Sequence, residues 1–522
     1  MHLYFALPNP GLESYFAKVR KGNDEEYRTT FAKGKSVSQV LSEWKPHLEK
    51  ISEKWPTLLD YENDLAKKVG PLSIQKPLKD RMDDIDSYYD SILLESKPIP
   101  HSAEAAVVRE WANHRGLALR SQSRTMDLMK KSTNSGSPFF VKRRAVTEKT
   151  VPCTLKIKGE EVLQSLPNAD YLSAAVLGWR GQEGGPTDED VKQRVVWMFP
   201  FSVNVQELQF YQPAIEQAQK SNIVPAWNGM DAVDLAITKL FDTKAKGDLI
   251  VCTDFSKFDQ HFNHDMQVCA KNIIASILNT SSESRQWLEE VFPIKYMIPL
   301  AYDMGKVRHG KHGMGSGSGG TNFDETLTHR ALQYEAAQSA GSKLNPYSMC
   351  LGDDGILSYP GITVEHVTQV YSSHGQDMNI DKQYASAHDC TYLRRWHHES
   401  YRVDDVCVGV YSTYRALGRL MEQERFYDPE VWGPKMVALR QLSIIENCKY
   451  HPLFTEFIEF CMARDKYRLG IDIPGFLDNI QTIAQDSIEL MPDFLGYTKS
   501  LDKSDKAYGI ADWAVVKYLK SK

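Results

Sequence analysis

Two adjacent carboxylates at a glycine-bounded turn, Asp353 and Asp354, constrain the fold of this chain more than any other feature. A glycine precedes the pair and another follows it, which is typical of a tight hairpin between two strands. About a hundred residues earlier, a short apolar, β-prone run ends at Asp254 and is followed by a further acid, Asp259. The sequence therefore predicts a strand that ends in one acid and a hairpin whose turn carries two more.

A glycine-rich segment, residues 313–322, lies between the two acidic sites. Glycine lets the backbone approach a ligand closely. A helical pattern follows from Thr321, which with Asp324 fits a capping box, to Gly341, which fits a helix end. The sequence therefore predicts a close-approach loop that leads directly into a helix.

These three segments, in this order, resemble motifs A, B and C of viral RNA-dependent RNA polymerases. Residues 254–259, 316–322 and 352–355 are most similar to the polymerases of small segmented double-stranded RNA viruses, picobirnaviruses first and partitiviruses second. The resemblance covers about residues 130–400. It implies an α+β right-hand polymerase fold with fingers, a palm of antiparallel sheet backed by helices, and a mainly helical thumb.

The resemblance also implies a division of the chain into subdomains. A length of 522 residues exceeds one ordinary core, which agrees with several packed units. The expected segments are an N-terminal extension that bridges fingers and thumb (1–65), fingers (66–223), palm with motif A (224–270), a fingers insertion (271–312), palm with motifs B, C and D (313–390), and thumb with C-terminal tail (391–522).

Nucleotidyl transfer is best served by two divalent ions, one at the primer hydroxyl and one at the triphosphate. Magnesium prefers oxygen ligands and keeps several waters, so two or three carboxylates suffice. We predict that Mg²⁺, with Mn²⁺ as the alternative, binds Asp254, Asp353 and Asp354, the first two as bridging ligands. Like charges this close are expected to raise at least one carboxyl pKa. By resemblance to motif D, Lys382 would donate a proton to pyrophosphate.

By resemblance, Asp259 would accept a hydrogen bond from the ribose 2′-hydroxyl, with Ser316, Thr321 and Asn322 as its partners. Related polymerases place an asparagine four residues after the threonine. This chain has Glu325 there, so Asn322 and Glu325 are both candidates to complete the sugar site.

Basic residues upstream resemble motif F, which lines the entry channel for nucleoside triphosphates. Lys192 and Arg194 alternate, so both side chains would leave a strand on the same face. Arg180 is expected in a glycine-rich loop, residues 178–186. A guanidinium fork suits phosphate oxygens, and lysine adds a mobile charge.

The net charge of −6 is unusual for a protein that merely coats nucleic acid, so RNA contacts must come from local clusters. Residues 130–161 carry eight Lys or Arg and three Glu, a net charge of +5. The loop 135–138 resembles motif G, which touches the template, and residues 391–396 resemble motif E. The predicted RNA-binding residues are Ser135, Gly136, Pro138, Lys142, Arg143 and Arg394.

Eight scattered cysteines without a C-x-x-C pair predict buried free thiols, and no apolar run approaches membrane-spanning length. The expected partners are RNA template and product, ribonucleoside triphosphates and a viral capsid protein, and no membrane contact is expected. We expect a monomer that acts in the virion interior and the host cytoplasm. One hypothesis is that the aromatic-containing segment 492–522 reaches into the product channel and supports primer-independent initiation.

Two other functions share parts of this pattern. A reverse transcriptase or DNA polymerase also carries paired acids, but Gly352 and the pair of Asp259 with Asn322 favour ribonucleotides. A capsid-associated RNA-binding protein without turnover would be hindered by the acids electrostatically. The sequence therefore predicts an RNA-dependent RNA polymerase that replicates and transcribes a double-stranded RNA virus genome.

Overall fold

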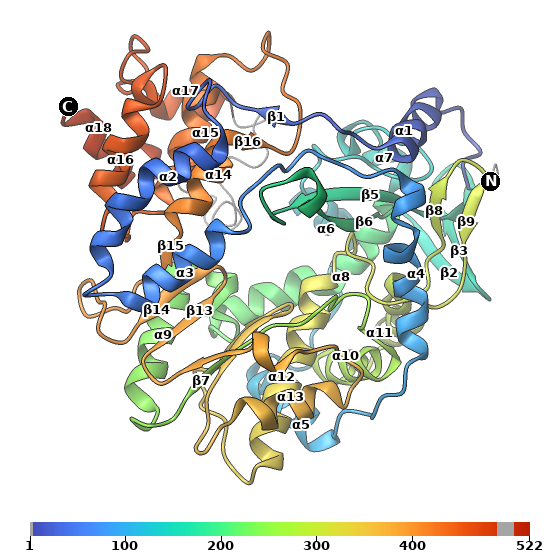
Figure 1. The fold of residues 1–522 in the computed structure, drawn as a ribbon. Helices are drawn as coiled ribbons and strands as arrows, with labels where there is room; N and C mark the ends of the chain where they lie inside the picture. Colours follow the sequence, from blue (N-terminus) through green and yellow to red (C-terminus); the bar gives the residue numbers. More distant parts are fainter. Residues whose placement is uncertain (1–3, 488–505) are drawn as a thin grey trace.

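Three groups of helices and strands surround the centre of the molecule (Figure 1). In that view one four-stranded sheet with its helices lies at the bottom, a second four-stranded sheet lies at the right, and the C-terminal helices lie at the upper left. The structure, a computed structural model, describes residues 4–487 and 506–522. No helix within those ranges combines the length and apolar character needed to cross a membrane.

The sheet at the bottom carries the acids and is antiparallel throughout, as predicted. Alternate side chains of the strand at residues 250–253 face opposite layers of the fold. Val251 lies in the largest core, whereas Ile250 and Cys252 pack toward α9 (Met230–Thr243). The strand order is β10 (Met349–Leu351), β11 (Asp354–Leu357), β7 (Ile250–Thr253) and β12 (Tyr384–Ser386).

Helices back this sheet on the side of the largest core (Figure 1). They are α5 (His101–Glu110), α10 (His264–Ile277), α12 (Thr321–Ser339) and α13 (Val364–Ser372). The predicted end of α12 is confirmed, since Gly341 follows the helix with φ +68°. The helix α5 ends at Glu110 and α6 (Gln122–Leu128) begins separately, with Gly116 at φ +81° in the segment between them.

The sheet at the right has the order β6 (Lys192–Met198), β5 (Ala175–Gln182), β8 (Leu300–Asp303) and β9 (Lys306–Arg308). Because β8 pairs in parallel with β5, the segment after α11 (Ser282–Glu290) joins the sheet built by residues 175–198. The elements nearby are α4 (Met82–Asp90), α7 (Thr147–Thr150), β2 (Thr154–Lys158), β3 (Glu161–Ser165), β4 (Asp170–Ser173) and α8 (Phe201–Lys220).

The C-terminal part is mainly helical, as predicted. A small sheet precedes it, in which residues 389–398, around the segment that resembles motif E, form a hairpin. Its elements are β13 (Asp389–Tyr392), β14 (Arg395–His398), β15 (Val410–Tyr411), α14 (Thr413–Met421), β16 (Glu422–Gln423), α15 (Pro434–Glu446), α16 (Phe454–Ala463), α17 (Ile480–Ser487) and α18 (Ala514–Lys520).

The segment for which a role in initiation was suggested lies partly outside the described residues, namely at 492–505. Within the described remainder, α18 packs on α15, where the carboxylate of Glu446 accepts the backbone N–H groups of Ala514 and Val515. All eight cysteines are buried and free, as predicted.

The N-terminal residues run between the two upper groups (Figure 1). The helix α1 (Pro10–Lys21) lies against the right-hand sheet, where Arg20 pairs with Asp303 at 2.6 Å. The strand β1 (Tyr27–Arg28) then pairs with β16, and α2 (Val37–Leu48) and α3 (Pro56–Ala66) pack on α14. Trp44 of α2 is buried and donates from Nε1 to Thr413. The chain thus ties the sheet at the right to the C-terminal helices.

A buried ionic network holds the start of α12. The Asp324 carboxylate lies 2.9 Å from Lys295 Nζ and accepts hydrogen bonds from the hydroxyls of Tyr211 and Tyr296. Asp324 is therefore turned inward and is not part of a capping box. The hydroxyl of Thr321 donates to the Gly315 carbonyl, so the predicted capping box is wrong.

We expect Asp324→Asn to lower the free energy of unfolding by about 3 kcal/mol, because it leaves the buried Lys295 ammonium without its nearest counter-charge. The measurement is thermal unfolding of the full chain followed by circular dichroism. Asp64→Asn on the exposed face of α3 is the matched control and should change the midpoint little. Equal midpoints for the two variants would contradict the assigned role of the network.

Candidate active site

The pairing of β7 with β11 brings the acids to one end of the bottom sheet. Thr253 lies opposite Gly355, so the next pair in the antiparallel register is Asp254 and Asp354. Asp353 occupies the turn between β10 and β11, where Leu351 pairs with Asp354. The structure therefore brings together the three acids that were predicted to bind metal, Asp254, Asp353 and Asp354.

The acidic turn is held by two side chains of α12. The backbone N–H of Gly352 donates to Thr326 Oγ1, and the Gly352 carbonyl accepts from His329 Nδ1, each at 2.9 Å. Gly352 has φ +58°, a conformation that favours glycine. Burial lowers the pKa of His329 to about 4, so the ring is neutral and has one N–H to donate. Sequence reasoning missed both residues, for which the only signal was their spacing of three on one helix face.

The pKa values of Asp254, Asp353 and Asp354 are all raised, and burial is the largest cause for each. For Asp354 the value reaches about 7, with the neighbouring Asp353 as the next cause. The Leu393 N–H, which donates to Asp354 Oδ2 at 2.8 Å, works in the opposite direction. A raised pKa was predicted from repulsion between like charges, but desolvation contributes more.

The donor set fits divalent ions that take carboxylate oxygens. No group of three or more His, Cys, Asp or Glu side chains is already arranged around an ion position in residues 4–487 and 506–522. Magnesium needs fewer protein ligands than that, since it keeps waters and takes oxygens from the triphosphate. A bound cation would stabilise the ionised form of these carboxyl groups, which burial disfavours.

Basic side chains from separate segments of the chain lower the pKa of Asp254 and so oppose the effect of burial. Lys382, at the end of the 3₁₀ turn Ile380–Lys382, and Lys192 on β6 both lower the pKa of Asp254. Lys68 does so more strongly, and nothing in its sequence context had marked it. Gln383 was also missed, although its side chain exchanges hydrogen bonds with both backbone groups of Asp254, at 2.7 and 2.8 Å.

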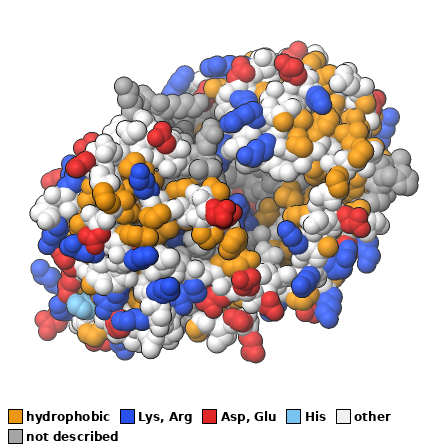
Figure 2. Space-filling view, turned by 90° about the horizontal axis from the view of Figure 1, so that it is seen from above, with side chains coloured by type: hydrophobic (Ala, Val, Ile, Leu, Met, Phe, Trp, Pro, Cys, Tyr) orange, Lys and Arg blue, Asp and Glu red, His pale blue; other side chains and the backbone are white. Residues whose placement is uncertain are grey.

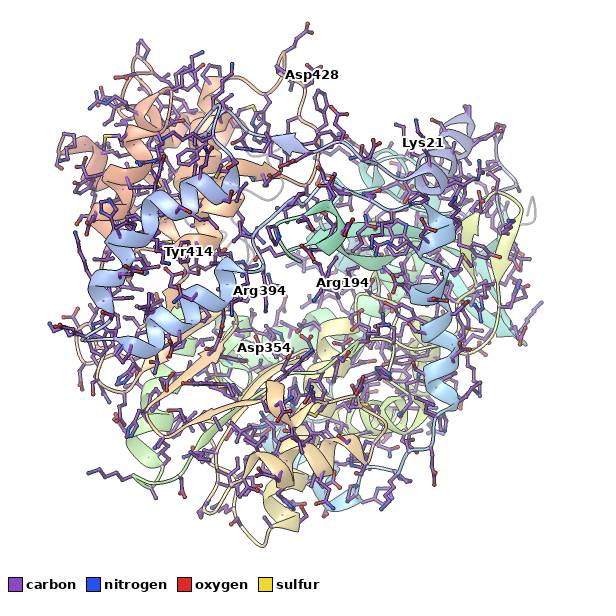
Figure 3. All side chains as sticks on the ribbon, viewed as in Figure 1. Lys21, Arg194, Asp354, Arg394, Tyr414 and Asp428 are labelled. Atoms are coloured by element: carbon purple, nitrogen blue, oxygen red, sulfur yellow. The ribbon has the colours of Figure 1, made fainter. Side chains whose placement is uncertain are left out.

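Arg194 and Arg394 approach the acids from opposite sides (Figure 3). Arg194 leaves β6 on the same exposed side as Lys192, as predicted, and pairs with Asp259 at 3.3 Å. Arg394, in the turn between β13 and β14, lowers the pKa of Asp353 and Asp354. Arg394 had been predicted to bind RNA, and the structure directs its charge toward the acidic turn.

Arg180 lies in a strand and not in the predicted loop, because residues 176–182 pair with residues 192–198 without interruption. Its guanidinium lies 3.5 Å from Glu424, which also accepts the backbone N–H of Gly181. Arg180 thus contacts the loop after β16, and within the described residues it makes no hydrogen bond or ion pair with Asp254, Asp353 or Asp354.

The residues predicted to surround Asp259 have other hydrogen-bond partners. Ser316 accepts from the Trp197 N–H and Asn322 accepts from Trp227 Nε1 at 2.9 Å. Asp259 itself accepts from Arg194 at 3.3 Å. Glu325 is buried, and its pKa is raised well above its usual range, first by burial and then by the charge of Asp259.

The loop predicted to touch the template is largely buried. Ser135, Gly136 and Pro138 are buried, and a Cβ on Gly136 would lie 2.7 Å from the Phe199 carbonyl. Arg143 donates to Asn204 at 2.7 Å, so its guanidinium has an internal partner. Lys142 alone among these remains exposed. The surface seen from above is hollowed between two lobes, with Lys and Arg side chains on both sides (Figure 2).

The comparisons with known proteins agree with this geometry. A family model described as viral RNA-dependent RNA polymerase matches residues 118–406. The chain belongs to this family. A human picobirnavirus protein named "Potential RNA-dependent RNA polymerase" is 60% identical over 99% of this chain and 98% of its own length.

Solved structures give the same result. The crystal structure of the RNA-dependent RNA polymerase of a human picobirnavirus is 60% identical, with a TM-score of 0.95 over 100% of this chain and 98% of that one. Its insertion loop deletion mutant is 57% identical, with a TM-score of 0.94 over the same shares. A Sicinivirus polymerase, 13% identical with a TM-score of 0.53 over 72% of this chain and 83% of its own, shares the fold alone. The predicted right-hand polymerase fold and RNA-directed RNA polymerase activity are confirmed.

We expect Gly355→Ala to displace the acidic turn, because its Cβ would lie 2.6 Å from the His329 ring. The strain should cost about 1–3 kcal/mol of stability and reduce RNA synthesis well beyond that of the control. Gly247→Ala, where a Cβ meets nothing within 4 Å, is the matched control. Parallel measurements of unfolding and nucleotide incorporation check this, and full activity of Gly355→Ala would contradict it.

Proposed function

We propose that this chain replicates and transcribes the genome of a double-stranded RNA virus related to the picobirnaviruses, by template-directed RNA synthesis at Asp254, Asp353 and Asp354. The observation that carries this proposal is the register of β7 against β11, which sets acids from two distant segments side by side. The human picobirnavirus polymerases, similar over nearly their whole length, support the virus group.

In this proposal Asp254 and Asp353 would hold Mg²⁺ or Mn²⁺. Asp354, whose carboxylate accepts the Leu393 N–H, would stabilise the bound ions from beside them. The ions would supply activation of the primer hydroxyl and neutralisation of the triphosphate. Gln383 fixes the backbone that carries Asp254, and Thr326 with His329 fixes the turn that carries Asp353. The acids are therefore held before substrate binds.

Lys192 and Arg194 would bind the triphosphate, since they leave one strand on the same side and act on the acids through space. Lys382 would donate a proton to the leaving pyrophosphate. Ser316, which accepts from the Trp197 N–H of β6, and Thr321, which donates to the Gly315 carbonyl, would fix the glycine-rich loop that shapes the nucleotide pocket. We assign Arg180 to the contact with Glu424 in place of the triphosphate.

The subdomain boundaries given above for fingers, palm and thumb are part of the proposal. Contacts of α1 with β8, and of α2 and α3 with α14, support the bridging role of residues 1–65. Lys142 and the other exposed basic side chains of residues 130–161 would contact RNA. The further proposals are a monomer, a capsid protein as partner, and action in the virion interior and host cytoplasm.

We expect Asp353→Asn and Asp254→Asn each to reduce RNA synthesis by roughly 10³-fold or more, because the ions lose a charged oxygen ligand. The assay incubates the purified chain with a short unprimed RNA, ribonucleotides and magnesium or manganese. RNA binding should be retained or strengthened, because a negative charge is removed.

Asp248→Asn, at the opposite end of β7, is the matched control and should keep its synthesis. If the variants at Asp254 and Asp353 also kept synthesis, the proposed site would be wrong. A parent chain that binds RNA but never extends it would favour the binding protein without turnover, and preference for deoxynucleotides would favour a reverse transcriptase.

A further inference from the structure

A hollow of about 200 Å³, called here the α5–α10 pocket, lies between the first turns of two helices in the group at the bottom of Figure 1. Its walls include the aliphatic side chains of Pro98, Ile99 and Val268. Its polar lining includes Glu104 and Asp265, and no Lys or Arg of the described residues contributes to it. Apolar walls with a few convergent polar groups are the usual composition of a ligand site. None of these residues takes part in RNA synthesis as proposed above.

The carboxylate of Glu104 is only half paired. Glu104 is 6% exposed, and its Oε1 is hydrogen-bonded to the His101 ring at 3.0 Å. Its Oε2 is buried without a hydrogen-bond partner in the part of the chain that the structure describes. His101 also lines the pocket, but its side chain is 94% exposed, so it offsets little of the buried charge.

Two contacts place the Glu104 carboxylate at the pocket. One is the hydrogen bond to His101, which lies on the pocket wall. The other is to Cys269, a second wall residue, since burial raises the pKa of this thiol well above its usual range and the charge of Glu104 adds to the shift. The carboxylate therefore faces the pocket from between two of its lining residues.

Asp265 supplies a second negative charge from the first turn of α10. Among the described residues, its carboxylate has one hydrogen-bond partner, the hydroxyl of Ser96. Acids in the first turn favour a helix, which accounts for the positions of both Asp265 and Glu104. It does not account for the Glu104 Oε2 atom, to which no backbone N–H of the described chain donates. A buried charge without hydrogen bonds is costly, so a bound donor would stabilise this arrangement.

The shape and charge of the pocket favour an organic cation. Its volume exceeds that of a metal ion, and it has aliphatic walls that an ion would not use. An alkylammonium group carries three N–H donors on a compact head and an apolar stem. Such a head can reach carboxylates on two helices while the stem lies against Pro98 and Val268. A planar guanidinium pairs best with one carboxylate in its own plane.

We propose that the α5–α10 pocket binds an aliphatic amine, whose ammonium head pairs with Glu104 and Asp265. This inference goes beyond RNA synthesis and does not depend on it. The same chemistry occurs in a free diamine and in the lysine side chain of a protein partner. The two sources differ in whether a peptide backbone follows the stem.

The experiment titrates the full chain, without RNA or nucleotide, with 1,4-diaminobutane and with Nα-acetyl-lysine methylamide. Isothermal titration calorimetry gives the affinity, and the thermal unfolding midpoint with and without amine gives a second readout, because a ligand of the folded state raises it. The neutral 1,4-butanediol has the length of the diamine without its charge and should not bind.

We expect Glu104→Gln and Asp265→Asn each to weaken binding about tenfold or more, because each removes a charged acceptor at nearly constant volume. Val268→Phe should weaken it as much by filling the pocket, although every carboxylate remains. Glu283→Gln, which removes an exposed acid from the first turn of α11, is the matched control and should bind as the parent does. Unfolding midpoints without amine check that each variant is folded.

Binding that all three pocket variants weaken supports the proposal, and the tighter of the two amines identifies the source. Absence of binding by both amines would overturn it, as would equal binding of the diol. Binding that persists in Glu104→Gln, or in a folded Val268→Phe, would also overturn it. So would binding that is lost only in Asp353→Asn, because the amine would then lie at the catalytic acids.

Discussion

The antiparallel pairing of β7 with β11 is the interaction on which the rest of the structure depends. It joins segments about a hundred residues apart and sets Asp254 opposite Asp354 at the end of the sheet. Burial of the carboxylates opposes this pairing, because desolvation is the largest cause of the raised pKa values of Asp254 and Asp354, and Asp353 adds repulsion at Asp354. Burial of both faces of β7, against α9 on one side and the largest core on the other, outweighs that cost. The hydrophobic layers thus hold charges together that would otherwise separate, and a bound cation would relieve the same strain.

Elements whose signal is local could be predicted from the sequence. The apolar run of β7, the alternation of Lys192 and Arg194, the helix that begins at Thr321 and the hairpin turn at Asp353 each depend on neighbouring residues. Glycine is more ambiguous. Gly178 and Gly181 suggested a loop around Arg180, but they lie in β5, where a side chain on Gly181 would collide with the Leu72 carbonyl. These glycines allow the N-terminal segment to pass closely over a strand, which composition alone does not distinguish from a turn.

The supporting residues of the site could not be predicted, because their contacts cross long stretches of chain. His329 and Thr326 reach the Gly352 backbone from α12, and Gln383 reaches Asp254 from beyond β11. Their residue types fit many surface or core roles. The same applies to the loop at Ser135, whose turn-forming composition suggested an exposed RNA contact although packing against Phe199 buries it. Acids and glycines indicate a site by their residue type, whereas the residues that hold them in place can be recognised only from their positions in the folded structure.

An acidic chain can act on RNA if its positive field is confined to the site. The charges that lower the acidic pKa values come from separate segments: Lys68 follows α3, Lys192 and Arg194 lie on β6, Lys382 lies before β12 and Arg394 follows β13. At the seam between the two upper groups, Glu183 pairs with Arg415 and Arg419 of α14, and Glu424 pairs with Arg180. These ion pairs help to hold β5, and with it Lys192 and Arg194 of the paired strand β6, against α14 and the loop after β16. The contacts that close the molecule therefore also assemble the electrostatic field in which the acids, the triphosphate and the RNA would meet.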